Sequence, residues 1–163
     1  MTEWISFAGA TGGASAGLTG LTFIVVSFRF DTIAVSQELR NRAAQTLSLF
    51  LTLTVVAVLI TVPQPLPVFG AELMAVALIS AVVLTRLNTV ALREQTTRPS
   101  VALRWALAVF VGGIAVAGLL EVLGAQWGMY LYVVSAILGL VWGVDGAWTF
   151  LTRAGIHPSA EES

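Results

Sequence analysis

The sequence predicts an all-α integral membrane protein, a bundle of about five transmembrane helices with the N-terminus outside and the C-terminus inside. Three observations predict it: a deficit of charge, a series of long uncharged segments, and arginines confined to one side. Of the 163 residues, 57% are hydrophobic and 10% charged, and the mean hydropathy is +0.90. Soluble domains carry about 25% charged residues, and small ones expose a large share of their surface to water. The composition therefore indicates that lipid is the solvent.

The first two spans follow from uncharged segments. A helix needs about 20 mostly apolar residues to cross a hydrocarbon core of about 30 Å. Residues 4–28 are uncharged and give the first span, 5–28, while residues 43–71 contain the second, 43–62. The second span ends at a Pro-Gln-Pro-Leu-Pro segment, because a proline lacks the N–H of the helix ladder and clashes with the preceding turn. The intervening loop, 30–42, is expected to form a short interfacial helix or to extend the second span into the cytoplasm.

The third span, 70–92, is less regular because it contains two charges. Only 13 uncharged residues separate Glu72 from Arg86, which is about 21 Å of helix at about 1.5 Å per residue. That length is too short to cross the hydrocarbon core. At least one of these charges is therefore expected to lie at membrane depth or to snorkel out of it.

The fourth and fifth spans, 101–122 and 128–152, complete a single transmembrane domain over residues 1–153. The remaining segment, 154–163, is polar and holds the only histidine, His157. A short polar terminus of this kind is typical of disorder. We expect it to be a cytoplasmic tail.

The distribution of basic residues predicts the orientation. Arginine-rich loops stay in the cytoplasm. In this topology all the basic residues fall on one side, namely Arg29, Arg40, Arg42, Arg86, Arg93, Arg98, Arg104 and Arg153. The other side has no base, and its Glu72 and Glu121 are expected to be solvated at the outer interface, with an outward-facing cation site as the less favoured alternative. The pattern predicts an outside N-terminus and an inside C-terminus.

Small residues recur every four positions in two of the spans. Gly9, Gly13 and Gly17 share a face of the first span, and Gly139 and Gly143 share a face of the fifth. Such faces let backbones approach closely, which holds helices together in lipid, where no hydrophobic drive acts between them. These glycines are candidate helix-packing residues. Two interpretations stay open: tight packing within the bundle, or a seam between protomers of a homo-oligomer.

Asp145 and Arg86 are the candidate functional residues of the membrane interior. Measured from the centres of their spans, they lie at nearly the same depth, on the cytoplasmic side of the midplane. Ionisable groups in hydrocarbon are costly, so they pair or face a cavity. We hypothesise an interhelical ion pair to which Asn88 adds a hydrogen bond. The pair would fix helix register or belong to a proton or ion site; alternatively, Arg86 snorkels to the headgroups and Asp145 meets interfacial water.

The remaining residue types do not indicate catalysis. The chain has no cysteine and one histidine, so the sequence offers neither a thiolate nucleophile nor the ligand spacing of a zinc site. Its glycine-rich segment lacks the Lys-Ser/Thr pair of a phosphate loop. The net charge of −1 argues against a nucleic-acid-binding protein, which needs a basic face. We therefore expect no enzymatic activity and no cofactor.

Two segments carry a resemblance to a known group of proteins. They are Phe-Ala-Gly-Ala-Thr-Gly-Gly-Ala-Ser-Ala-Gly-Leu-Thr-Gly-Leu-Thr-Phe-Ile-Val-Val-Ser at 7–27 and Asn-Arg-Ala-Ala-Gln-Thr-Leu at 41–47. Together with Gly-Ala-Glu-Leu at 70–73, after the proline bend, this part of the chain resembles small uncharacterised polytopic membrane proteins of high-GC Gram-positive (actinobacterial) bacteria. The resemblance implies a location in the bacterial plasma (inner) membrane. It implies no activity and no site residues.

Two functional hypotheses follow. The first is a non-catalytic structural or modulatory subunit of a larger membrane complex or a homo-oligomer, with the lipid bilayer and other membrane chains as its partners. The second is a small ion or proton channel or transporter, with its path beside Asp145 and Arg86. The short loops and the lack of catalytic groups favour the first hypothesis, and an enzyme acting on lipid is the least favoured.

Overall fold

A computed structural model describes residues 4–28, 30–35, 37–94, 101–125 and 127–154. Within these ranges the chain forms helices and no strand: α1 (Ile5–Phe28), α2 (Phe30–Val35), α3 (Gln37–Thr61), α4 (Leu66–Glu94), α5 (Val101–Val122) and α6 (Gly128–Ala154). All of them except the short α2 are long and apolar enough to cross a membrane. This confirms the predicted all-α architecture with five candidate spans. The predicted tail, including His157, lies outside the described residues beyond Ala154.

The helix boundaries agree closely with the predicted spans at α1 and α5, which begin and end at the expected residues. In contrast, α3 begins six residues before the predicted 43, and α2 precedes it, so the segment at 30–42 contains a short helix and also the start of the helix of the second span. α4 begins at Leu66 rather than at Gly70. A proline is tolerated in the first turn of a helix because the N–H it lacks would have no partner there, so the proline bend ends α3 and starts α4.

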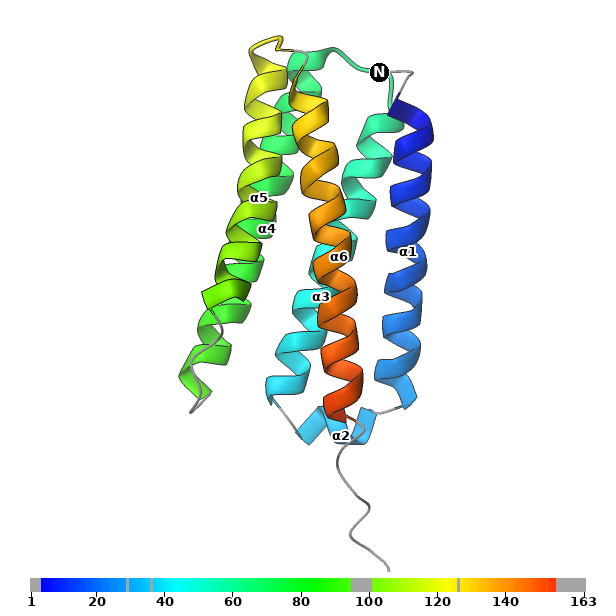
Figure 1. The fold of residues 1–163 in the computed structure, drawn as a ribbon, viewed down its shortest axis with the longest axis vertical. Helices are drawn as coiled ribbons and strands as arrows, with labels where there is room; N and C mark the ends of the chain where they lie inside the picture. Colours follow the sequence, from blue (N-terminus) through cyan, green and yellow to red (C-terminus); the bar gives the residue numbers. More distant parts are fainter. Residues whose placement is uncertain (1–3, 29, 36, 95–100, 126, 155–163) are drawn as a thin grey trace, which may run out of the picture.

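The long helices run alternately up and down, as Figure 1 shows. The start of α1, the α3–α4 connection and the α5–α6 turn lie at one end of the bundle, and α2 lies at the other. α3 is the central helix, since it packs against α1, α4 and α6. Half of its span is buried inside the bundle, against 17% of the α1 span. α1 is therefore the most peripheral of the five.

The bundle interior is apolar and closely packed. Its largest fully buried side chains include Tyr132, Phe50, Phe69 and Phe110. Close backbone contact joins α4 to α5, because a Cβ added to Gly70 would lie 2.6 Å from the Gly118 carbonyl oxygen. Glycine at such positions brings helix backbones together, which is how packing stabilises membrane helices.

Two hydroxyl pairs connect the central helix to its neighbours. The hydroxyls of Ser15 on α1 and Thr54 on α3 lie 2.9 Å apart, and those of Thr52 on α3 and Ser80 on α4 lie 2.8 Å apart. Hydrogen bonds between membrane helices contribute about 0.6 kcal/mol on average. The two pairs add a modest stabilisation and set the register of α1 and α4 on α3.

Candidate functional site

The structure does not bring the predicted ion pair together. Arg86 is exposed on α4 and Asp145 is exposed on α6. α4 packs on α5 and α3, whereas α6 packs on α5, α3 and α1, so α3 and α5 separate the two side chains. Among the residues that the structure describes, no ion pair joins them. Asn88 is half-buried and lines a groove between α4 and α5, away from α6.

The small residues of α6 pack inside the bundle. The Phe110 ring of α5 lies against Gly139, and the Phe50 ring of α3 lies against Gly143, so closely that a Cβ at either glycine would overlap ring atoms. Because glycine has no side chain, an aromatic ring can pack directly against its backbone, and the two helices come close together. Gly139 and Gly143 thus receive the large side chains of neighbouring helices.

The predicted glycines of α1 have a different environment. Gly9, Gly13 and Gly17 are exposed, and a Cβ added at any of them would meet nothing within 4 Å. Gly12, the residue before Gly13, approaches α3 instead. A Cβ added to Gly12 would lie 2.9 Å from the Cβ of Ala57. The stripe of Gly9, Gly13 and Gly17 therefore faces away from the bundle and has no partner within the described chain.

These glycines belong to a wider exposed face of α1. Helical residues three and four apart are neighbours on one face. Six of the exposed small residues with that spacing, Ser6, Gly9, Ala10, Gly13, Ala14 and Gly17, lie in the first half of α1, and we call this set the open small-residue face. It covers the half of α1 that is nearest the N-terminus. Beyond it the exposed residues become large, as at Leu21, Phe23 and Ile24.

The opposite side of α1 carries its polar groups and satisfies them. The hydroxyls of Thr11, Ser15 and Thr22 donate to carbonyl oxygens of their own helix at 2.8 Å. The open small-residue face, in contrast, consists of backbone, methyl groups and one serine. Within the described ranges no group of three His, Asp or Glu side chains could hold a metal ion. The chemistry of the open face therefore suits the surface of another helix rather than an ion or a polar ligand.

Glu121 is buried, so the prediction that it is solvated at the outer interface is wrong. Its side chain is 3% exposed, its carboxylate lies against the backbone N–H of Met129, and its Oε1 has no hydrogen-bond partner among the described residues. The cause is the tight α5–α6 turn, in which Gly124 has a φ of 74°. The turn brings the start of α6 over Glu121, where a Cβ on Gly128 would lie 2.6 Å from Oε1.

Glu72 lies at the same end of the bundle and is less buried than Glu121. Its side chain is half-buried, and its carboxylate accepts a hydrogen bond of 2.7 Å from Nε2 of Gln64. The amide of Gln64 therefore ties the proline bend to the second turn of α4. This contact explains how the third span accommodates the charge of Glu72 at its outer end.

Comparisons with known proteins give no match: no family model, curated protein or solved structure matches this chain. The resemblance of the segments at 7–27 and 41–47 to actinobacterial membrane proteins therefore stays a prediction from the sequence.

Proposed function

We propose that this chain is a non-catalytic subunit of a membrane complex, in which α1 packs against a transmembrane helix of another chain. One observation carries the proposal. The open small-residue face is exposed on the most peripheral helix, with only 17% of the α1 span buried, and a Cβ added at Gly9, Gly13 or Gly17 would meet nothing within 4 Å.

Physical chemistry supports the proposal because helix association in lipid depends on close packing. Lipid tails are as apolar as leucine, so packing gains come from van der Waals contact at small residues. The chain itself uses glycine in this way on α6, where Gly139 and Gly143 receive the rings of Phe110 and Phe50. The open small-residue face offers equivalent depressions, and no side chain of the described residues fills them.

The orientation that we infer follows the arginine pattern. Arg40 and Arg42 lie near the start of α3, and Arg86 lies toward the end of α4, which are positions at the α2 end of the bundle. Glu72 and Glu121 lie at the opposite end. Because basic residues stay on the cytoplasmic side, we infer an outside N-terminus, and the resemblance of the segments at 7–27 and 41–47 leads us to infer a bacterial plasma membrane. The open small-residue face then lies in the outer half of the bilayer.

The alternative of an ion or proton path beside Asp145 and Arg86 has less support. The two side chains are exposed on helices that α3 and α5 separate. Neither lines the cavity between α3, α5 and α6, nor the grooves between α4 and α5 and between α1 and α6. A permeation path would need polar groups converging on a shared cavity.

Crosslinking in the native membrane tests the proposal. The chain has no cysteine, so Ala14→Cys introduces a single thiol on the open small-residue face, to which a photoreactive label can be attached. We expect an adduct with another membrane chain, and its mass tells whether that chain is a different protein or a second copy. Ala75→Cys, at an exposed alanine of α4, is the matched control. Adduct formation at Ala14 no greater than at Ala75 would contradict the proposal.

A further inference from the structure

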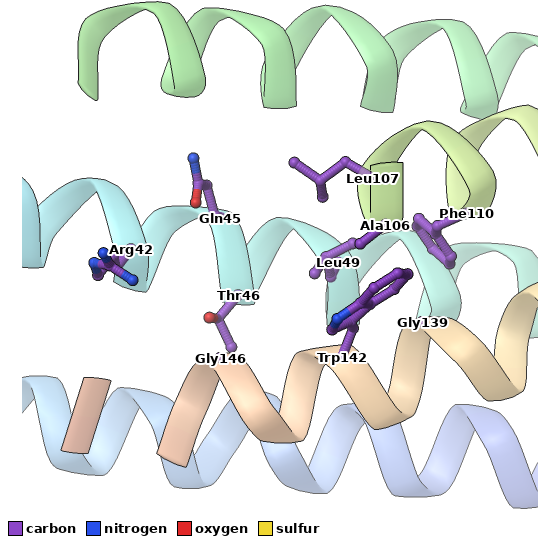
Figure 2. A pocket seen from close by; sticks show the side chains of 10 residues that line it. All are labelled: Arg42, Gln45, Thr46, Leu49, Ala106, Leu107, Phe110, Gly139, Trp142 and Gly146. Carbon is purple, nitrogen blue, oxygen red and sulfur yellow. The ribbon is translucent and has the colours of Figure 1, made fainter. Parts of the chain in front are cut away.

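A cavity lies between α3, α5 and α6 in the half of the bundle nearest α2, and Figure 2 shows the side chains around it. Its volume is about 50 Å³, which is room for a few water molecules or a group of similar size. One helical face of α3 provides its polar wall, through Arg42, Gln45 and Thr46. Trp142 of α6 and Phe110 of α5 provide aromatic walls. Gly139 and Gly146 of α6 contribute backbone to its lining.

The cavity changes from polar to apolar along its length. Arg42 lies at one end, Gln45 and Thr46 come next, and Leu49 and Phe110 lie at the other end, as seen along α3 in Figure 2. Arg42 and Leu49 are seven residues apart on one helix, which is about 10 Å at about 1.5 Å per residue. A ligand that fits both ends therefore has a polar or charged head and an apolar tail.

The polar end has the chemistry to bind a phosphate. An arginine has five N–H donors in a planar fork that matches phosphate oxygens, and Arg42, which also makes an interaction within the chain, lines this end. The amide of Gln45 and the hydroxyl of Thr46 are further donors on the same face. No carboxylate lines the cavity, and Asp145, which precedes Gly146 of the lining, is exposed.

We propose that this cavity binds the phosphate and the adjoining methylene groups of an anionic phospholipid. Basic pockets between transmembrane helices bind such headgroups. The apolar walls at Leu49 and Phe110 distinguish a lipid from a free phosphate ion, which would gain nothing from them. Because no acid lines the cavity, nothing there balances the ammonium group of a zwitterionic headgroup. The volume accommodates only this part of the lipid, so the rest lies along the outside of the bundle.

Native mass spectrometry of the full chain tests this inference. The chain is released from bilayers of equal parts phosphatidylglycerol and phosphatidylcholine, and the lipids that stay bound are counted. We expect one retained phosphatidylglycerol and at least about tenfold weaker retention in Arg42→Gln, since the charge-assisted hydrogen bonds to the phosphate are lost. The matched control is Arg40→Gln, because Arg40 is exposed, lies outside the cavity and donates to the Ala34 carbonyl oxygen. We expect it to retain the lipid as the unsubstituted chain does.

A second variant tests the apolar part without changing charge. Ala106 is buried and lines the cavity, so Ala106→Val reduces its volume and should also weaken retention. This variant carries the test if Arg42→Gln does not fold, as judged by helical circular dichroism. Three results would overturn the inference: equal loss in Arg40→Gln and Arg42→Gln, equal retention of phosphatidylcholine, or displacement of the lipid by millimolar inorganic phosphate.

Discussion

The phenyl ring of Phe50 lies in the space that Gly143 leaves by having no side chain, and this contact joins the central helix α3 to α6. Phe50 is completely buried. A second ring, that of Phe110, makes the same kind of contact with Gly139 and joins α5 to α6. The glycines of α6 are therefore filled from within the chain, whereas those of the open small-residue face are not.

This difference predicts opposite effects of the same substitution at two glycines. Gly143→Ala should destabilise the bundle by about 1–3 kcal/mol, because a methyl group must displace the buried ring. Gly9→Ala has open space around it and should be neutral or stabilising by up to about 1 kcal/mol, since alanine favours a helix over glycine. Reversible unfolding in mixed micelles measures both. Equal stability of the two variants would contradict the packing described for α6.

The hydrogen bond between the hydroxyls of Thr52 and Ser80 predicts a loss of stability when one of them is removed. Both residues are buried, so Thr52→Val removes the contact and leaves Ser80 without this partner. We expect a destabilisation of about 1 kcal/mol, within the range for a buried polar group that loses its partner. Thr61→Val is the control, because Thr61 is exposed and bonds only to its own helix, at Val58. The free energy of unfolding is again measured in mixed micelles. A decrease in Thr61→Val as large as in Thr52→Val would show that the Thr52–Ser80 hydrogen bond does not stabilise the bundle.

The buried carboxylate of Glu121 predicts that a neutral side chain at this position makes the bundle more stable. Burying a carboxylate without full hydrogen bonding is costly, and Oε1 of Glu121 has no partner among the described atoms. Glu121→Gln keeps the shape and an acceptor for the Met129 N–H, so it should raise the free energy of unfolding by about 1 kcal/mol or more. Glu72→Gln, at a half-buried carboxylate bonded to Gln64, should not. A less stable Glu121→Gln variant would show that the carboxylate itself is needed there.

Much of the fold was predictable because charge and proline mark the ends of membrane spans directly. The limits of α1 follow from the uncharged segment between Glu3 and Arg29. The start of α4 was not predictable in this way, since the prolines at 63–67 end one helix and also fit the first turn of the next. The presence of each helix thus follows from composition, whereas the start of α4 at Leu66 depends on how the prolines fit the first turn of the helix.

The candidate site was predictable only in part, because sequence gives the depth of a residue but not its neighbours. Arg86 and Asp145 lie at similar predicted depth, yet other helices separate them. On α1 the neighbouring residues Gly12 and Gly13 have opposite environments, because Gly12 contacts Ala57 of α3 and Gly13 is exposed. The burial of Glu121 depends on the turn at Gly124, which no periodicity in the sequence indicates.

The central claim is that the open small-residue face of α1 packs against another membrane helix. The most direct measurement is the mass of the assembly that contains this chain, after extraction from its native membrane in a mild detergent, for Gly13→Ile and for the unsubstituted chain. Gly112→Ile is the matched control, since Gly112 of α5 is also exposed with nothing within 4 Å.

We expect the unsubstituted chain and Gly112→Ile to run in a complex larger than the 17.2 kDa monomer, and Gly13→Ile to run as a folded monomer, because the isoleucine fills the depression that the partner helix would occupy. An assembly of unchanged mass in Gly13→Ile, or a monomeric unsubstituted chain, would contradict the account.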